Sequence, residues 1–200
     1  GFKWIANVMR ENEGKKNYIG GGEESYGFLC EDFVRDKDAV SACVILAEIA
    51  AWAKDQGLSL YQLLQKIYVE YGFSKEKGIS VVKKGKSGAE EIEAMMKKFR
   101  ENPLTEIAGS KVTYFYDYST LKGKDYAENE TVTLDMPTTS NVLQYFTEDN
   151  TKVSIRPSGT EPKIKFYMEV QGEMGCRNCY ASAESAAMEK IEAVKKSLGI

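Results

Sequence analysis

Histidine is absent from the 200 residues of this chain. A Ser-His-Asp or Cys-His mechanism therefore cannot be assembled from its own side chains. Any acid–base chemistry would have to use carboxylates, lysines, tyrosines or cysteines. The sequence also has no run of the roughly 18 apolar residues that a transmembrane helix requires. These absences favour a protein that does not enter a membrane and does not work as a histidine-dependent hydrolase.

The chain also has no surplus of positive charge, and it has few cysteines. The formal net charge is -3, so we expect no general nucleic-acid or anionic-membrane surface, since both need a basic patch. Only four cysteines are present, which favours a reducing, cytoplasmic setting. Cys176 and Cys179 form a Cys-x-x-Cys pair, which can be redox-active or half of a zinc site. Because no second pair and no histidine accompany it, we predict that the pair is incidental.

The chain changes character near residue 105. Before that point, helical patterns alternate with short strands, and the clearest helix is predicted at 37–56. Asp36 is a candidate cap for this helix, and its apolar residues on nearly every side predict deep burial. After that point, alternating and β-branched residues predict a group of strands followed by a final helix at 181–198. Domain boundaries at 1–104 and 105–200 follow from this change.

The segment 156–165 concentrates the groups that bind phosphate. Arg156 offers a planar fork of donors, Ser158 and Thr160 offer hydroxyls, and Gly159 permits close approach of the backbone. Lys165 adds a positive charge on the next predicted strand. The alternative is an ordinary hairpin turn, in which Ser, Gly and Pro are common for conformational reasons.

A second candidate loop, at 20–25, is acidic. The carboxylate of Glu23 can accept hydrogen bonds from two neighbouring sugar hydroxyls, and Ser25 adds a donor and an acceptor. The alternative is an acidic surface loop in water. Lys37 is a third candidate, because a lysine at the start of a helix is unfavourable for the helix dipole. It either pairs with a neighbouring aspartate, contacts a substrate phosphate or transfers a proton.

Three motifs together resemble the carboxy-terminal half of the α-D-phosphohexomutase superfamily. They read GEESYGF (22–28), FVRDKDAV (33–40) and VSIRPSGTEPKIKFY (153–167). The bacterial α-phosphoglucomutase branch is the most similar. The resemblance implies an α/β plus α+β fold, in which a partial α/β/α third domain precedes a small α+β domain with an antiparallel sheet.

The resemblance also implies roles for individual residues. Glu23 and Ser25 match ligands of the sugar hydroxyls, and Gly1 matches the end of another sugar-contacting loop. Lys37 matches a lysine that acts near the transferred phosphate. The phosphate-binding residues that it implies are Arg156, Ser158, Gly159, Thr160 and Lys165.

The resemblance implies a reaction in which a phosphoserine converts glucose 1-phosphate to glucose 6-phosphate through a bisphosphorylated sugar. The serine and metal loops of the family do not occur in this sequence. We therefore expect a carboxy-terminal piece that is inactive alone and works with amino-terminal domains of the same chain. Those domains would hold Mg²⁺, and glucose 1,6-bisphosphate would be the activator. The alternatives are a phosphopentomutase, a phosphomannomutase, a non-catalytic phosphosugar-binding module and a structural domain without a ligand.

Overall fold

A computed structural model describes residues 1–23, 26–83, 85–159 and 161–200, and of Lys86 the backbone alone. The chain divides into two compact units, Gly1–Gln65 and Lys66–Ile200. The division differs from the boundary near residue 105 that the change in composition predicted. Strand β3 and helix α4 precede residue 105 but belong to the second unit, because β3 pairs along its whole length with β10 near the end of the chain.

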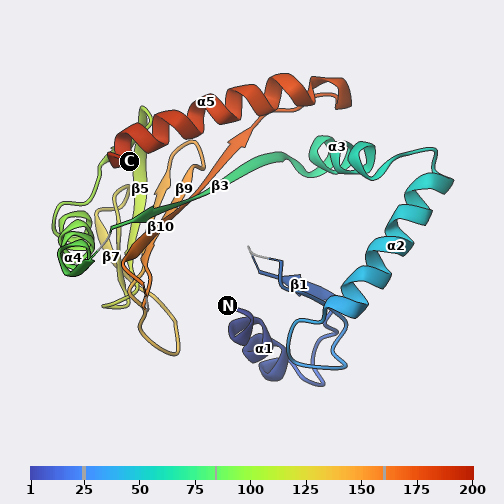
Figure 1. Ribbon diagram of the computed structural model, residues 1–200, viewed down its shortest axis with the longest axis horizontal. Helices are drawn as coiled ribbons and strands as arrows, with labels where there is room; N and C mark the ends of the chain where they lie inside the picture. The colour runs from blue at the N-terminus through green and yellow to red at the C-terminus, as the bar shows by residue number, and fades with distance from the viewer. Residues whose placement is uncertain (24–25, 84, 160) are drawn as a thin grey trace. The chain divides into compact units, whose positions relative to one another are not determined.

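The first unit places helices around a short pair of strands (Figure 1). Strands β1 and β2 are antiparallel, and Gly21 lies opposite Leu29. Phe2, Met9 and Leu29 are buried together, so α1 packs against the strand pair. In chain order the elements are α1 (Phe2–Glu11), β1 (Gly20–Gly22), β2 (Phe28–Cys30), α2 (Ala39–Asp55) and α3 (Leu60–Tyr71), the last of which continues into the second unit.

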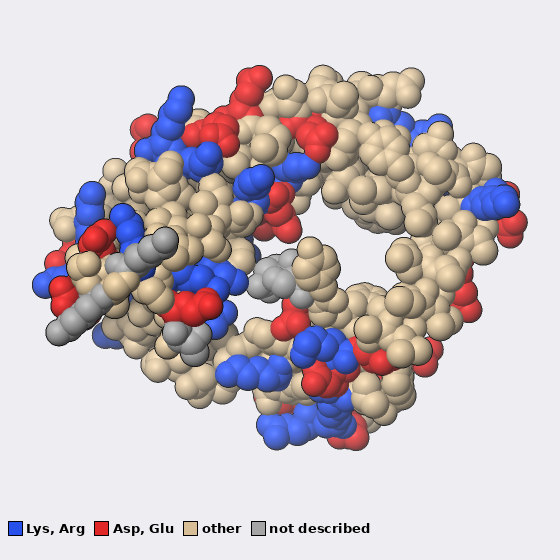
Figure 2. All heavy atoms as spheres, viewed as in Figure 1, with Lys and Arg blue, Asp and Glu red and all other residues tan. Residues whose placement is uncertain are grey.

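Helix α2 corrects two predictions. It begins at Ala39 rather than residue 37, because Asp38 is its cap and accepts a 2.8 Å hydrogen bond from the Ser41 amide. The carboxylate of Asp36 accepts from the Lys37 amide instead. The helix is also not deeply buried: among the described residues it packs against β2 and buries only Ala53, and Figure 2 shows mostly uncharged atoms on its visible face. Apolar composition indicates that a helix prefers burial, but it does not supply the element that covers it.

The second unit is built on one antiparallel sheet in the order β3-β10-β9-β8-β5-β6-β7, with β4 paired to β5. Its helices α4 and α5 contribute to a single hydrophobic core with the sheet, and α5 runs along the sheet in Figure 1. The elements are β3 (Phe73–Val82), α4 (Gly85–Glu101), β4 (Glu106–Ile107), β5 (Ser110–Asp117), β6 (Lys122–Asp125), β7 (Glu130–Thr133), β8 (Leu143–Thr147), β9 (Lys152–Pro157), β10 (Lys163–Gly172), the 3-10 turn η1 (Arg177–Cys179) and α5 (Tyr180–Leu198).

Alternation along β9 and β10 decides which side chains reach this core. Ile155, Ile164 and Phe166 are fully buried, whereas Arg156 and Lys165 point to the other face of the sheet, because successive strand residues face opposite sides. The predicted alternation over 152–156 and 164–170 is therefore observed. The predicted fold class is confirmed as well.

In the described part of the chain, no helix is both long enough and apolar enough to cross a membrane. The same residues contain no group of three or more His, Cys, Asp or Glu side chains that could hold a metal ion.

Candidate functional site

The acidic loop begins directly after β1 and lies against the start of α1. Glu23 follows Gly22, and its amide donates to the Gly27 carbonyl at 2.7 Å, which closes the turn between β1 and β2. Oε1 of Glu23 accepts a 2.8 Å hydrogen bond from the Phe2 amide at the first turn of α1. A carboxylate at this end of a helix is favourable because the first amides have no partner within the helix. Ser25 lies outside the described residues.

Gly27 is a site residue that the sequence alone did not predict. A Cβ atom built on Gly27 would clash with Glu23 Oε2 and lie 2.9 Å from Cδ of Lys37. The side chains of Glu23 and Lys37 therefore converge over this glycine. Gly1 is adjacent, since a Cβ there would lie 3.4 Å from Glu23 Oε1. The structure thus brings together three residues that the sequence predicted separately.

Lys37 carries its charge beside two carboxylates. Its Nζ lies 3.1 Å from Oδ1 of Asp36. The hydrogen bond and the charge of Asp36, with a further contribution from Glu23, raise the pKa of Lys37 above its ordinary value. Pairing with a neighbouring aspartate, one of the three readings of Lys37, is therefore observed. A raised pKa favours a permanent cation over a lysine that gives up a proton near neutral pH.

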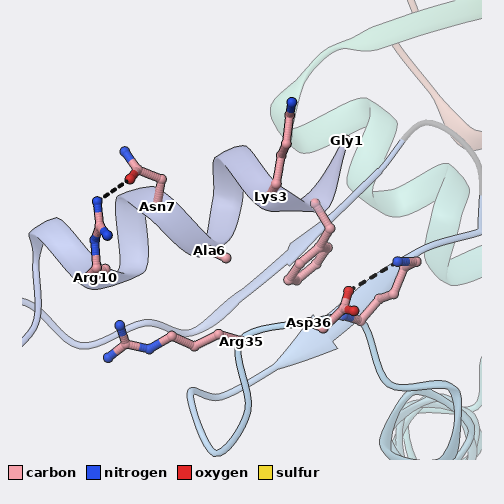
Figure 3. Close-up of a pocket in the computed structure, with 9 residues that line it drawn as sticks. Gly1, Lys3, Ala6, Asn7, Arg10, Arg35 and Asp36 are labelled. Carbon is pink, nitrogen blue, oxygen red and sulfur yellow. Dashed lines mark hydrogen bonds and ion pairs between the residues drawn. The ribbon is translucent and has the colours of Figure 1, made fainter. Parts of the chain in front are cut away.

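A shallow pocket of about 610 Å³ lies between α1 and the segment that leads to α2. Four cationic side chains line it, Lys3, Arg10, Arg35 and Lys37, with Asp36 as the acidic residue (Figure 3). Arg10 donates to Asn7 on the same helix, and Arg35 forms a 2.7 Å ion pair with Glu13. The pocket has the charge to hold an anion. The sequence alone did not predict Lys3, Arg10 or Arg35 as site residues.

The predicted phosphate loop joins β9 to β10 in the second unit. Lys165 lies opposite Arg156 in the strand register, so their side chains are neighbours on the same face of the sheet. Neither has an ion-pair partner among the described residues, whereas Lys163 is paired with Glu161. Arg156 is exposed. The charge of Lys165 also helps Lys163 to lower the pKa of Glu161, so this carboxylate lies within electrostatic range of the pair. Two adjacent cations that are not in a close ion pair with a carboxylate are suited to a dianion.

The tip of this loop turns through Ser158 and Gly159. The Ser158 amide donates to the Lys163 carbonyl at 2.8 Å, and the Ser158 hydroxyl accepts from the Glu161 amide at 3.3 Å. A Cβ at Gly159 would meet no atom within 4 Å, so open space adjoins the backbone there. Packing within the chain therefore does not require a glycine here. The open space would allow a ligand to approach the backbone closely. Thr160 lies outside the described residues.

A groove of about 760 Å³ runs between this loop and α4. Ser158 and Gly159 line one side, and Lys97 and Arg100 line the other. Arg100 is held by a 2.9 Å ion pair with Asp117 and by a hydrogen bond to Asn141. The sequence alone does not predict this groove, because no local motif relates α4 to a loop some 60 residues later.

Comparison with known proteins decides the family. Two models of phosphoglucomutase/phosphomannomutase domains match the chain, the alpha/beta/alpha domain III over residues 1–71 and the C-terminal domain over residues 79–175. The chain belongs to the phosphoglucomutase/phosphomannomutase family. The resemblance to phosphohexomutases is thereby confirmed. The two matched regions meet close to the division between the two units.

Curated relatives support the same assignment. The chain is 38% identical over 170 residues to a phosphoglucomutase of Staphylococcus haemolyticus and 39% identical over 171 residues to one of Staphylococcus aureus. These alignments cover 85% and 86% of this chain but only 31% of each relative. An open-form crystal structure of pp63/parafusin, a phosphoglucomutase from Paramecium, matches the whole chain and 34% of its own with a TM-score of 0.53. At 17% identity, that last match shows the fold alone.

Proposed function

We propose that this chain supplies sugar-phosphate recognition to a phosphoglucomutase that interconverts glucose 1-phosphate and glucose 6-phosphate. The observation that carries the proposal is the pair of family matches, with relatives named phosphoglucomutase over both units. The parent enzyme would be an intramolecular phosphotransferase. A phosphoserine would donate its phosphoryl group to the sugar phosphate, and the other phosphate of the bisphosphorylated sugar would return to the serine.

The non-reacting phosphate would bind at the loop between β9 and β10. Arg156 and Lys165 would supply two neighbouring positive charges for the phosphate. Ser158, Gly159 and Thr160 complete the proposed loop. A phosphate dianion is favoured over a neutral sugar because no carboxylate pairs with either of the two cations among the described residues.

The sugar hydroxyls would bind at the acidic loop, through Glu23 and Ser25. One oxygen of Glu23 already accepts from the Phe2 amide, which holds the carboxylate in position. A carboxylate oxygen has more than one lone pair, so the group can still accept from hydroxyls. We propose that Lys37 contacts the transferred phosphate as a cation, since its raised pKa keeps it protonated.

The remaining parts of the reaction would come from other segments of the parent. Because the described residues hold no cluster that fits a metal ion, no step of this proposal is assigned to Mg²⁺ within this chain. Mg²⁺ would bind in the amino-terminal domains, and glucose 1,6-bisphosphate would act as activator. The 200-residue chain alone would show no turnover in an assay with glucose 1-phosphate, Mg²⁺ and the bisphosphate. Turnover well above background would contradict this part of the proposal.

The decisive experiment compares inhibition by inorganic phosphate in two variants of the full-length enzyme. Arg156→Ala removes a charge-assisted contact of about 1.5–3 kcal/mol, so phosphate inhibition should weaken by roughly 10- to 100-fold. Glu23→Gln keeps the shape of the side chain but makes the acceptor neutral. It should alter discrimination among sugars and leave phosphate inhibition nearly unchanged.

Lys152→Ala is the matched control, since Lys152 lies on the same strand and the same face as Arg156 but outside the loop. Equal relief of inhibition by Lys152→Ala and Arg156→Ala would indicate a general charge effect and contradict a defined phosphate site. If Glu23→Gln also weakened inhibition by phosphate, the assignment of phosphate binding to one loop and sugar binding to the other would be contradicted.

Kinetic measurements on the same full-length enzyme would distinguish between the alternative functions. The values of kcat/KM for the 1-phosphates of glucose, mannose and ribose should be highest for glucose. A higher value for ribose would identify a phosphopentomutase, and a higher value for mannose a phosphomannomutase. A parent without the serine and metal loops would be a non-catalytic phosphosugar-binding module.

A further inference from the structure

A disulfide joins Cys176 to Cys179 in the connection between β10 and α5. The pair begins one residue beyond the region that matches the C-terminal domain of the family, which ends at residue 175. Neither cysteine lines a pocket described above. The pair is therefore separate from the sugar-phosphate sites, and its chemistry can be considered by itself.

The two cysteine residues differ in their exposure to solvent. Cys176 is exposed and caps the 3-10 turn η1, which runs directly into the 19-residue helix α5. Cys179 ends that turn, is half-buried and packs against the core of the second unit. A small reagent in solution therefore meets Cys176 first.

The location also favours exchange over a purely structural role. The disulfide closes a loop of only four residues, and a short loop gives the smallest entropic stabilisation of a fold. The start of a long helix stabilises a thiolate, and a thiolate is both the better nucleophile and the better leaving group in exchange. Among the described residues there is no third ligand that would make the pair a metal site instead.

We propose that Cys176 and Cys179 form a reversible thiol–disulfide exchange site for small thiols and disulfides of the glutathione class. In reduction, an external thiolate attacks Cys176 Sγ, the bond between the two cysteines breaks, and Cys179 leaves as a thiolate that takes up a proton. A second external thiolate then attacks the mixed disulfide at its external sulfur. Cys176 is released as a thiol, and the external reagent leaves as its own disulfide.

Oxidation runs in the opposite direction through the same intermediate. The Cys176 thiolate attacks an external disulfide and expels one thiol, and Cys179 then displaces the second thiol from the mixed disulfide. Two electrons and two protons pass from the cysteine pair to the external disulfide. In a reducing compartment the pair would be a dithiol, and an oxidant of this class would close it. The proposal does not depend on mutase activity.

Formation or reduction of the disulfide should change the packing of the residues at the start of α5. Tyr180 follows Cys179 directly and packs with Tyr68 and Phe73, with ring centroids 6.2 Å and 5.9 Å away. Reduction removes the covalent link that holds the turn before Tyr180. Tyrosine fluorescence and near-ultraviolet circular dichroism are therefore optical signals that should follow the redox state of the pair.

The test is a redox titration of the folded 200-residue chain in buffers of reduced and oxidised glutathione. Samples are quenched with acid, alkylated and digested, so that mass spectrometry reports the state of each cysteine separately. We expect the fraction of closed pair to depend on the glutathione ratio and to reach the same value from the oxidised and the reduced starting states. A pair that stays closed in reduced glutathione, or stays open in oxidised glutathione, would overturn the proposal.

Two variants test the order of attack. Cys179→Ser should accumulate a mixed disulfide with glutathione at Cys176, because the resolving thiol is missing. Cys176→Ser should form the corresponding adduct at Cys179 several-fold more slowly. Exposed Cys43 is an internal control, since it can form an adduct but has no partner that resolves it. Equal rates at Cys176 and Cys179, or a faster rate at Cys179, would contradict the assigned roles, and the titration remains decisive if a variant does not fold.

Discussion

Gly27 shows how one missing side chain organises the acidic loop. The carboxylate of Glu23 and the aliphatic part of Lys37 both approach the position that a Cβ atom on Gly27 would take. Both functional side chains therefore depend on the absence of a Cβ atom at this position. The glycine is needed for space, which is a different reason from the backbone freedom usually associated with glycine in turns.

Gly27→Ala should consequently disturb the first unit. The added methyl group must displace the carboxylate of Glu23 or the aliphatic stem of Lys37. Because both contacts involve the far ends of flexible side chains, the cost should be about 1 kcal/mol, at the lower end of the range for overpacking. Thermal unfolding followed by circular dichroism measures the effect. Gly78→Ala is the matched control, since a Cβ there meets nothing within 4 Å. Equal stability of the two variants would show that Glu23 and Lys37 do not converge over Gly27.

Asp149 links the turn between β8 and β9 to helix α5. Its carboxylate accepts from the hydroxyls of Thr147 and Thr151 at 2.6 Å and 2.8 Å, and it forms a 2.8 Å ion pair with Lys190. Partial burial raises the pKa of Asp149, but the hydrogen bonds from Lys190 and the two threonines outweigh it. They hold the pKa well below its usual value. The ionised form is therefore the one that stabilises the fold.

Asp149→Asn should lower the free energy of unfolding by about 1 kcal/mol at pH 7, a modest figure because the carboxylate is partly exposed. A depressed pKa contributes stability above the unfolded-state pKa of about 3.9, and the contribution is lost as pH falls toward the folded-state pKa. Urea unfolding at several pH values should show the two proteins converging below about pH 4. Glu148→Gln, at the exposed neighbouring residue, should not reproduce this pattern.

At the scale of the element, helix α2 shows how a cap is chosen. Asp36 and Asp38 are both acceptable capping residues, but only Asp38 accepts from an amide in the first turn. Asp36 is occupied by the amide and the ammonium group of Lys37. The cap made by Asp38 therefore marks the residue after which the helix begins.

Replacing each aspartate by alanine should change the free energy of unfolding by different amounts. Asp38→Ala removes the cap of α2 and should cost about 1 kcal/mol, whereas Asp36→Ala loses only an exposed ion pair and should cost much less. Chemical denaturation of the two variants makes the comparison directly. A larger loss for Asp36→Ala would restore the helix start at residue 37 that the sequence pattern predicted.

At the scale of the whole molecule, the two units have very different cores. The buried cluster of the first unit is Phe2, Met9 and Leu29, with Ile5 and Tyr18 against it. The second unit buries a continuous cluster from Phe73 to Leu198, formed by the central strands of its sheet and by α4 and α5. Because stability follows buried apolar surface, the second unit should be the more stable.

Native-state hydrogen exchange tests this order. Amides of β9 and β10 should exchange slowest, and those of α1, β1 and β2 should exchange first, at denaturant concentrations that leave the second unit folded. Exchange of both units in one cooperative step, or earlier exchange of the second unit, would contradict the difference in their cores.

The sequence alone determined the features that depend on near neighbours. Alternation at 152–156 and 164–170 predicted β9 and β10, since side chains of a strand alternate between its two faces. The order of residues in the three motifs was enough to indicate the family. Neither inference needed to know which distant segments meet.

Tertiary structure decided everything that depends on pairing between distant segments. Lys165 lies beside Arg156 because of strand register, and β3 extends over Phe73–Val82 because β10 supplies hydrogen bonds along its length. The Phe2 amide meets Glu23 because α1 folds against the strand pair. Within this chain, which spans 31% of the length of its relatives, helix α2 buries only Ala53 among the described residues, although its composition is apolar. Such contacts are fixed by the folded chain, and no local pattern of residues encodes them.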